Sequence, residues 1–575
     1  MDVSAYERRI AELLPRFLTH LDSNPFSPTF GCMDRDWWHY KIQAFPSATY
    51  QQGVLVLAWL YRHGAPGIPA HSPEVLRAIA AALKFWAKIQ HRDGSFDEWY
   101  PQEHSFVATA FTTHAVSEVW LELGNQITKS TGWSASDTLE RAGEWLLRHD
   151  DLMLSNHQAG KIAALHNLSL FFPGGRFGTG ARLALERLIK VQHPEEGWFP
   201  EYGGADPGYQ SVTFDYLAQY FNRSRDDNVV LPLEKASYFL SWFLHPDGSV
   251  GGTYGSRNAR YLFTHGLELV ADRIPPAAAI LDKMNLLGGE DLPWLPKGMD
   301  ARYLIFFFLP NLLGAYEVRK ERKEPHPREF FLEEATRFFE GAGLWVARRK
   351  HYYAVVNVRK GGVLRAHARE RTGPGRLAVV DGGYFVRTRG SRVAASHALQ
   401  VKPSRDFGYE AKELLPGKWK ICCRAPFVWV KHFSPSPLRQ ALFYIFLVTV
   451  GRIPWVRHKL DAWLRNALVR RQIRAPYRLE RTIVFSAEGV DIEDKITRSR
   501  RGARALSLGR ANDHTSIHVP SSLQYSAADR WEGWGVEPAA VAEHLNQTGE
   551  ATLTLHRDFL KSELESVETH ETRPQ

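Results

Sequence analysis

Sulfur-containing side chains are scarce in this 575-residue sequence, which has three cysteines and five methionines. Cys32 stands alone, and Cys422 and Cys423 are adjacent, so the chain offers neither a disulfide framework nor the cysteine spacing of a zinc site. Few and unpaired cysteines fit a reducing compartment. We therefore expect a cytoplasmic protein, and the sequence indicates no metal ion and no cofactor.

The chain also lacks a segment that would carry it into or across a membrane. Its first residues predict an amphipathic helix over 5–22 instead of the basic and then apolar pattern of a signal peptide. The apolar run from Ala441 to Val450 is about ten residues long, whereas a spanning helix needs about twenty. These absences argue against export through a cleaved signal and against a spanning helix.

No nucleic-acid-binding module is recognisable, although Lys and Arg outnumber Asp and Glu by 72 to 63. The net charge of +9 favours an acidic partner, so an anionic polymer or a membrane surface ranks above nucleic acid. The chain holds 18 Trp, 21 Tyr and 32 Phe residues. Most of these rings are expected in the core, and the rest predict a cleft in which aromatic side chains stack on a sugar.

One loop recurs through the first half of the chain, as Gln90–Phe96, Gln192–Phe199 and His245–Ser249. Its glycines are spaced by two units and then one unit of about 51 residues, and a degenerate copy falls in phase near 146–151. Helical patterns dominate this half, including one over 257–272. The period predicts stacked helical hairpins, in a solenoid or a closed toroid, with the equivalent loops on one rim.

The pattern changes after a charged, proline-containing stretch at 321–329, which predicts a linker. Beyond it, short runs of alternating apolar residues with glycine-rich turns are typical of an antiparallel sandwich. The sequence thus predicts a multidomain protein, α then β. A domain of helical hairpins, a solenoid or a toroid, is expected at 1–320, and an antiparallel β-sandwich domain is expected at 330–575.

Residues 436–474 depart from the strand pattern of the second domain. The apolar run there is followed by a basic segment that includes Arg452 and Lys459, and Trp455 and Trp463 stand among the charges. Apolar, basic and tryptophan residues in this order resemble an interfacial amphipathic helix. We predict a basic amphipathic helical insertion, either packed on the toroid or in peripheral contact with the inner face of a membrane.

Residues just after the repeat loops are rich in side chains that bind sugars or move protons. Stacking would bring the heads of these helices to one rim, together with residues of the first hairpin. Singly, Asn156 or Ser256 could merely cap a helix, whereas a converging set predicts a cleft. The residues predicted to bind substrate there are Arg35, Trp38, His39, Tyr50, Gln51, Glu98, Trp99, Glu201, Tyr202, Gln210 and Tyr254.

Three stretches together resemble one known family. Asn156-His157 opens a helix, Gly197-Trp198-Phe199-Pro200-Glu201 follows, and Pro207-Gly208-Tyr209-Gln210 comes next. They resemble the heparinase II/III-like polysaccharide lyases and the related uronyl epimerases. The resemblance implies an (α/α) toroid followed by a β-sandwich. It also implies that Asn156 binds the uronate carboxylate and that Tyr209 is the acid or the base.

The chain departs from that family in the sandwich, where such lyases commonly carry a His-x-His-x-Asp-like strand. Only Arg365-Ala366-His367-Ala368-Arg369 and Ser396-His397 stand in its place. No ligand set for zinc is evident in these stretches. The sequence therefore predicts no metal, and it leaves open which histidine of the sandwich joins the site.

The implied reaction cleaves a uronic-acid-containing anionic polysaccharide or oligosaccharide by removal of the C5 proton and β-elimination. Neutralising the sugar carboxylate makes that proton more acidic, a role for Asn156 with Arg257 or Arg35. Tyr209 and a histidine would then supply the base and the acid. The predicted catalytic residues are Asn156, His157, Tyr209, His104 and Arg257.

Three other functions stay open on the sequence. A uronyl C5-epimerase that modifies a nascent, lipid-linked glycan would use the same site, because reprotonation at C5 without loss of the leaving group inverts that carbon. A glycoside hydrolase would use paired carboxylates such as Glu98 and Glu201. A non-catalytic glycan-binding protein would keep the fold without the chemistry.

Overall fold

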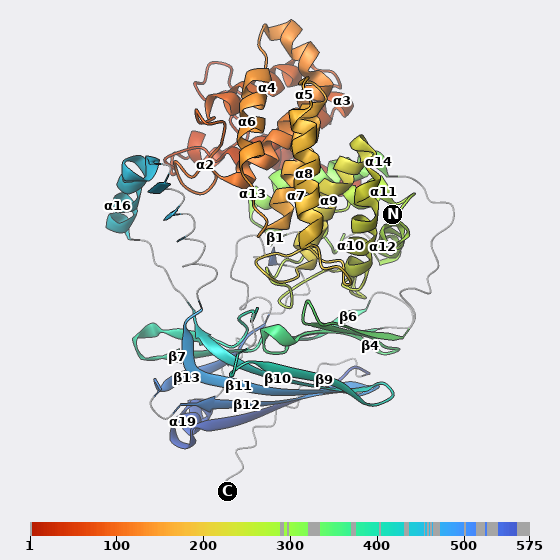
Figure 1. The fold of residues 1–575 in the computed structure, drawn as a ribbon, viewed down its shortest axis with the longest axis vertical. Helices are drawn as coiled ribbons and strands as arrows, with labels where there is room; N and C mark the ends of the chain where they lie inside the picture. Colours follow the sequence, from red (N-terminus) through yellow and green to blue (C-terminus); the bar gives the residue numbers. More distant parts are fainter. Residues whose placement is uncertain are drawn as a thin grey trace.

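The computed structural model of the chain has a helical half and a β half, in that order along the sequence (Figure 1). The helical half ends at Val318 and the β half begins at Ala335, so the predicted change of architecture is confirmed. The predicted linker at 321–329 lies outside the described residues. The structure describes residues 3–287, 292–295, 298–319, 334–369, 375–401, 404–430, 436–453, 455–456, 459–460, 463, 472–499, 502–512, 524–525 and 539–560.

Most of the first 318 residues fold into helices joined by the repeat loops. The predicted helix over 257–272 is wrong in its first half, because residues 257–264 form a loop. The helices are α1 (Val3–Leu18), α2 (Arg35–Trp38), η1 (Ala48–Gly53), α3 (Val54–His63), α4 (Pro73–Lys88), α5 (Phe106–Thr131), α6 (Ser136–Arg148), α7 (Ser155–Ser169), α8 (Arg176–Val191), α9 (Pro207–Ser224), η2 (Asp227–Val229), α10 (Val230–Ser241), α11 (His265–Val270), α12 (Pro275–Leu287), α13 (Ala301–Tyr303), η3 (Leu304–Phe308) and α14 (Leu309–Val318).

These helices close into a ring, which decides between the solenoid and the toroid left open by the sequence. Going around the inner ring, α3 packs on α5, α5 on α7, α7 on α9, α9 on α11, α11 on α14, and α14 returns to α3. Helices α4, α6, α8, α10 and α12 pack outside them. Of these, α4 contacts α3 and α5, α6 contacts α5 and α7, α8 contacts α7, α10 contacts α9, and α12 contacts α10 and α11. One apolar core runs from Tyr6 in α1 to Leu313 in α14.

Two of the repeat loops are fastened to the next hairpin in the same way, through a glutamine side chain. In the first full copy, the Gln90 side-chain amide donates to the carbonyls of Gly94 and Thr138, at 3.0 and 2.9 Å. In the second, Gln192 donates to the carbonyls of Gly197 and Pro232, at 2.8 and 2.9 Å. Each glutamine therefore closes its own loop and holds the outer helix region that follows.

The repeat glycines allow this close approach. Gly94 and Gly197 have φ of +98° and +80°, in the left-handed region that favours glycine. A Cβ on Gly94 would lie 2.1 Å from the carbonyl oxygen of Arg141, and one on Gly197 would lie 2.3 Å from that of Lys235. The turns are scaffolding that seats one repeat on the next.

The β half consists of two antiparallel sheets and a two-stranded ribbon. The five-stranded sheet has the order β2-β3-β4-β5-β6, and the larger sheet has the order β13-β7-β8-β10-β11-β12-β15 with β9 paired to β10. The strands are β1 (Gly298–Met299), β2 (Ala335–Phe339), β3 (Leu344–Arg348), β4 (Tyr352–Asn357), β5 (Val363–Ala368), β6 (Arg376–Asp381), β7 (Tyr384–Thr388), β8 (Val393–Ala395), β9 (Gly408–Leu415), β10 (Lys418–Trp429), β11 (Arg474–Phe485), β12 (Gly489–Arg498), β13 (Ala505–Arg510), β14 (Gln524–Tyr525) and β15 (Glu550–Asp558).

The five-stranded sheet is covered on both faces, which joins the two halves. Every residue of β4 and β5 is buried. One face meets the larger sheet, where the Trp345 and Phe485 rings stack at 4.8 Å, as in a β-sandwich. The other face packs on the toroid, where Phe339 contacts the rings of Phe239 and Phe243 at 5.2 and 5.7 Å. The toroid rim that carries the repeat loops therefore faces the sheets (Figure 1).

The predicted insertion at 436–474 contains helix α16 (Pro437–Val448), which lies beside the toroid rather than in the sandwich (Figure 1). The Phe443 ring meets the Tyr100 ring of the first repeat loop at 6.0 Å. In the described part of the chain, no helix has the length and the apolar content needed to cross a membrane.

Replacing Gly197 by alanine is expected to destabilise the toroid more than replacing Gly132. Gly132 has φ of +67° with no atom within 4 Å of a Cβ, so G132A carries only the conformational cost of about 1–2 kcal/mol. G197A adds the clash with the Lys235 carbonyl. Thermal unfolding of both variants measures the difference. Equal losses for both would show that the loop does not need this close contact.

Candidate active site

A buried carboxylate joins three separate segments at the rim. The Asn156 side-chain amide donates to one oxygen of Glu201 at 2.9 Å, and Arg257 Nη1 donates to the other at 2.9 Å. Asn156 stands in the first turn of α7, Glu201 in the loop before α9, and Arg257 in the loop before α11. Ser256 also donates its hydroxyl to the Glu201 carbonyl at 2.9 Å. The repeat thus brings residues of three hairpins to one point.

The N-terminus of α9 explains why Arg257 lies in a loop. Asp206 caps this helix by accepting from the Tyr209 amide at 3.1 Å, and Pro207 follows at the first helical position. The other Asp206 oxygen accepts from the Arg257 amide at 2.8 Å and from the Ala259 amide at 3.4 Å. Because these two amides bond to Asp206, they cannot bond within a helix. The same bonds hold the backbone of Arg257 in place beside Asp206.

Arg257 lies between two tyrosine rings. Its guanidinium is 4.7 Å from the Tyr202 ring centre and 4.6 Å from the Tyr209 ring centre, and Nη2 is 3.4 Å from the Tyr209 hydroxyl. Tyr209 also meets the Tyr261 ring at 5.8 Å. Tyr209 is therefore in contact with both a cation and another tyrosine ring.

Glu201 and Arg257 respond oppositely to burial. Burial raises the pKa of Glu201 to about 8, although the charge of Arg257 and the Asn156 hydrogen bond act against that rise. Burial tends to lower the pKa of Arg257, but Tyr209 and Glu201 outweigh it and hold the pKa above its ordinary value. Arg257 stays a cation, while the Glu201 carboxyl titrates close to neutral pH.

His157 stands next to Asn156 in α7 and is oriented by a buried acid. Its Nδ1 lies 3.1 Å from Asp151 Oδ2. The imidazole packs beside the Phe106 ring at 6.4 Å and edge-on to the Phe111 ring at 6.0 Å. Asp151 was not among the predicted residues. An acid that fixes one imidazole nitrogen leaves the other for proton transfer, which is the arrangement of a general base.

A row of aromatic rings connects His157 to the other side of the rim. Phe111, which touches His157, meets Phe307 at 5.9 Å, and Phe307 stacks on Tyr303 at 5.5 Å. Burial raises the pKa of Tyr303, and the charges that act on its hydroxyl next are those of Tyr209 and Arg302. Tyr303, which sequence reasoning missed, therefore lies between the Arg257 group and a second arginine.

The second arginine, Arg302, forms the other polar group of the rim. Its Nη2 donates to Glu98 at 2.9 Å, to the Thr49 hydroxyl at 2.8 Å and to the Ser47 hydroxyl at 3.2 Å. The guanidinium lies 4.1 Å from the ring of Trp99, which is 52% exposed. Glu98 and Trp99 were predicted here. Arg302 was not predicted, because it contacts Glu98 only when the ring of helices closes.

A further, half-buried carboxyl group, that of Glu103, lies beside Arg302 and its partners. Glu103 accepts from the backbone amides of Glu98 and Trp99, at 2.9 and 2.6 Å. Burial and then the charge of Glu98 raise the pKa of Glu103 to about 8. Tyr50, another predicted residue, lies 5.6 Å from the Arg302 guanidinium. The predicted pair of hydrolase carboxylates, Glu98 and Glu201, is thus divided between two arginines.

Several predicted residues support the rim from beneath instead of facing the cleft. Gln51 is buried and bonds to the backbone of Met33, Gly31 and Ala82. Gln210 and Tyr254 are likewise buried and bond within the protein. On α2 and just after it, Arg35 and Trp38 bond to the carbonyls of Thr19 and His20, and His39 is exposed.

The His104 side chain bonds within the first repeat loop. Its Nδ1 lies 2.7 Å from Asp93 Oδ2 and 2.6 Å from the Ser95 hydroxyl, and its ring stacks on His91 at 4.0 Å. The bond from His104 lowers the pKa of Asp93 despite the opposing effect of burial. Of the two histidines predicted to be catalytic, His157 therefore has the more suitable surroundings.

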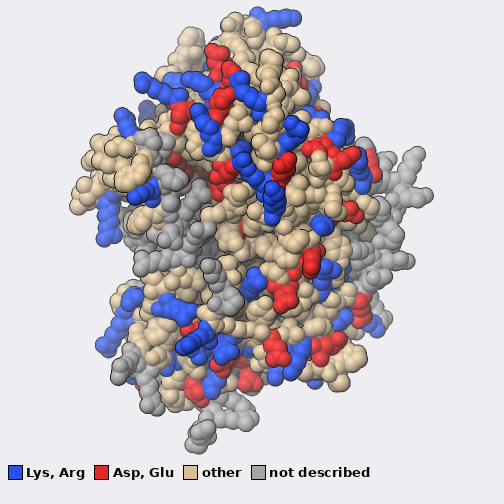
Figure 2. All heavy atoms as spheres, viewed as in Figure 1, with Lys and Arg blue, Asp and Glu red and all other residues tan. Residues whose placement is uncertain are grey.

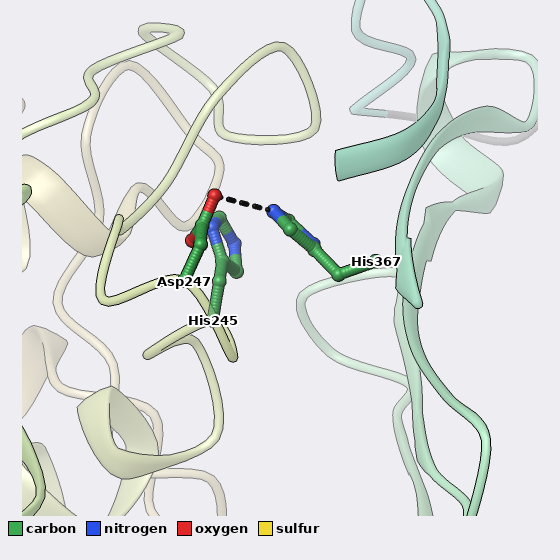
Figure 3. A group of neighbouring side chains, drawn as sticks. All are labelled: His245, Asp247 and His367. Carbon is green, nitrogen blue, oxygen red and sulfur yellow. Dashed lines mark ion pairs between the residues drawn. The ribbon is translucent and has the colours of Figure 1, made fainter. Parts of the chain in front are cut away.

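The two sandwich histidines left open by the sequence have separate places. The segment after β8 that carries His397 rests on the loop next to Glu201, where a Cβ on Gly204 would lie 2.8 Å from Leu399. His367 in β5 instead meets the third repeat loop, with Nε2 3.2 Å from Asp247 Oδ2 (Figure 3). The His367 and His245 rings are 4.6 Å apart.

His245, Asp247 and His367 together could ligate a metal, because one ligand atom from each lies within 4.8 Å of the others. Their contacts argue for an ion pair instead. Both His245 nitrogens face hydroxyl groups, those of Ser249 and Tyr254, at 2.8 Å each. Burial and then the positive charges of His367 and Arg365 hold the pKa of His245 well below its ordinary value. Both His245 nitrogens are thus engaged by hydroxyl groups and Asp247 is paired with His367, so we interpret the group as a polar contact between toroid and sheet.

No protein-family model and no curated protein matches the chain. Among solved structures, a chondroitin AC lyase of Streptomyces coelicolor A3, solved in complex with chondroitin sulphate, matches 88% of this chain and 68% of its own, at 13% identity and a TM-score of 0.52. The chain shares the fold of that lyase. The predicted fold, an (α/α) toroid followed by antiparallel sheets, is therefore confirmed.

Two weaker likenesses accompany it. A heparinase III structure matches 88% of this chain and 73% of its own, at 8% identity and a TM-score of 0.47. A GH127 β-L-arabinofuranosidase from Geobacillus stearothermophilus T6 matches 76% of this chain and 94% of its own, at 10% identity and a TM-score of 0.35.

The raised pKa of Glu201 gives an expected pH dependence of stability. The folded state holds this proton more tightly than the unfolded chain, so the stabilisation is complete at low pH and is lost as pH rises through about 8. E201Q should make the fall in thermal midpoint between about pH 4.5 and pH 8 shallower, with Glu186→Gln on the exposed face of α8 as control. A slope unchanged by E201Q would contradict the assignment.

Proposed function

We propose that the chain is a polysaccharide lyase that cleaves a uronic-acid-containing anionic polysaccharide by C5 proton abstraction and β-elimination. The observation that carries the proposal is the contact between the Tyr209 hydroxyl and the half-buried Arg257 guanidinium, at 3.4 Å. Asn156 and His157 stand at the same rim. The lyase fold of the chain supports the same class of reaction.

Arg257 and Asn156 would neutralise the carboxylate of the sugar. Both now donate hydrogen bonds to Glu201, so the carboxyl group of Glu201 marks the position in which the sugar carboxylate would bind. Because the Glu201 carboxyl titrates near pH 8, its protonation at neutral pH frees the charge of Arg257 for the substrate. A sugar carboxylate bound there would make the C5 proton more acidic and stabilise the enolate that forms.

Tyr209 and His157 would exchange the protons. One of them removes the proton from C5, the C4–C5 double bond forms as the C4–O bond breaks, and the other gives a proton to the leaving oxygen. Arg257 favours the phenolate of Tyr209, and Asp151 orients the imidazole of His157. The exposed ring of Trp99 and the half-buried ring of Tyr202 would stack on neighbouring sugars.

A uronyl C5-epimerase is the second candidate. Tyr209 and His157 come from different helices, α9 and α7, so one could remove the C5 proton and the other return a proton to the opposite face. The leaving oxygen would then stay in place. The two reactions differ only in whether the C4–O bond breaks before C5 is reprotonated.

Replacing Tyr209 by phenylalanine is expected to lower turnover by a factor of about 10²–10⁴, because the ring stays against Arg257 while the proton-transfer group is lost. The assay follows near-ultraviolet absorbance of the unsaturated product on a panel of uronic-acid polymers, chondroitin sulphate included. The matched control is Y316F, which removes the exposed hydroxyl that Tyr316 of α14 donates to Glu7 of α1.

The same panel separates the alternatives. Solvent deuterium at C5 without chain cleavage would identify an epimerase. New reducing ends without unsaturation would identify a hydrolase. Full lyase activity in Y209F would remove Tyr209 from the mechanism.

Replacing Asp151 by asparagine tests the orientation of His157. Asparagine has nearly the same shape as aspartate, but it no longer fixes which nitrogen of the His157 imidazole carries the proton. We therefore expect kcat to fall while KM changes little. A change in KM alone would place Asp151 in substrate binding.

A further inference from the structure

Helix α16 exposes an apolar surface that the rest of the molecule leaves uncovered. Leu438, Leu442 and Ile445 are 70%, 57% and 57% exposed, and they are spaced to share one side of the helix. Within α16, all of which is described, only Leu447 is buried. We call this exposed side, together with the exposed residues Val448, Val450, Ile453, Trp455 and Trp463, the α16 surface.

The α16 surface is unusual for this molecule. Nine of the exposed large apolar side chains in the described part of the chain lie between Leu438 and Ile473. Soluble proteins rarely expose a contiguous apolar patch without a partner. The toroid touches this helix at Phe443, through the ring of Tyr100, but that contact leaves the leucines and tryptophans in solvent.

Positive charges border the α16 surface. Residues 436–474 contain eight Lys and Arg residues and one Asp. Arg439 and Arg452 are exposed beside the apolar side chains, and Lys459 lies 4.1 Å from the ring of the exposed Trp455. In Figure 2, Lys and Arg side chains lie at the border of the region that α16 occupies on the left of Figure 1.

The charge decides between the partners that an apolar surface could meet. A second copy of the chain would bring the same arginines face to face, which costs free energy on both sides. An anionic lipid surface meets both requirements, because acyl chains take the leucines, the interface takes the tryptophans, and the headgroups attract the arginines. We propose that the α16 surface docks the protein on an anionic membrane surface without crossing it.

Docking would also place the mouth of the cleft. Phe443 of α16 contacts Tyr100, and the neighbouring Trp99 lies over Arg302 in the candidate site. A membrane that holds α16 therefore lies close to this side of the rim. Resting on the proposed function, this proximity points to a substrate class, namely an anionic glycan attached to a membrane lipid.

Sedimentation with vesicles tests the docking. The full chain should bind vesicles that contain phosphatidylglycerol, bind pure phosphatidylcholine vesicles much less, and release as salt is added. The double variant L442E/I445E should lose binding. The double variant L183E/L231E changes two comparably exposed leucines on α8 and α10, so it should bind like the parent. Changing Arg439 and Arg452 to glutamine should weaken binding by about thirtyfold.

Three outcomes would overturn the proposal. The first is no binding to anionic vesicles, and the second is equal binding by L442E/I445E and the parent. The third is a dimer in sedimentation equilibrium that L442E/I445E dissociates, because a second copy would then cover the surface.

Activity on a soluble polymer separates this proposal from the proposed function. Leu442 and Ile445 lie outside the candidate site, so L442E/I445E should cleave a soluble polymer at the parent rate while losing action on a glycolipid in vesicles. Vesicle binding without any lyase activity would support the docking and contradict the proposed lyase function. Lyase activity without vesicle binding would support the lyase function and contradict the docking.

Discussion

The buried carboxyl group of Glu201 is the constraint on which the candidate site depends. Burying a polar group is costly unless it is hydrogen-bonded, and here Asn156 and Arg257 from two other hairpins supply the hydrogen bonds. The three loops must therefore meet for any of them to be stable in its place. The same contact sets Arg257 against Tyr209, so the chemistry of the site follows from the way one acid is satisfied.

Closure of the toroid gives this site its second wall. Helix α14 returns to α3, and the segment before it carries Arg302 and Tyr303 to the start of the chain. Arg302 then meets Thr49 and Glu98, residues that a solenoid would have kept apart. An open stack of the same hairpins would hold the Glu201 group alone. The ring brings Arg257 and Arg302 to the same rim, with a row of aromatic rings between them.

The doubly buried sheet fixes the rim from the other direction. Because one face of the five-stranded sheet packs on the larger sheet and the other on the toroid, the two halves cannot separate without exposing Phe339 and its neighbours. The Asp247–His367 pair adds a polar contact across the same boundary. The repeat loops are thus held between packed helices and a packed sheet, which orders the side chains of the cleft.

Local pattern was enough to predict the architecture. The Gly94 and Gly197 turns and the shift to alternating strands involve only a few neighbouring residues each, and the turns recur at a fixed period of about 51 residues, so all of them can be read along the chain. Asn156 and Tyr209 could be identified for the same reason, since each stands in the first turn of a helix after a repeat loop. Whether they act in catalysis remains a prediction.

Tertiary structure decided what depends on distant partners. Arg302 and Glu98 are separated by 204 residues, and no local pattern reports a pair formed by ring closure. Tyr254 and Gln210 were indistinguishable from cleft residues in sequence, yet packing buries both. The Asp206 cap turned a helical pattern at 257–264 into a loop, because a carboxylate that accepts three backbone amides outweighs helix propensity. The sequence determined the elements and their order, whereas the contacts between them selected the site.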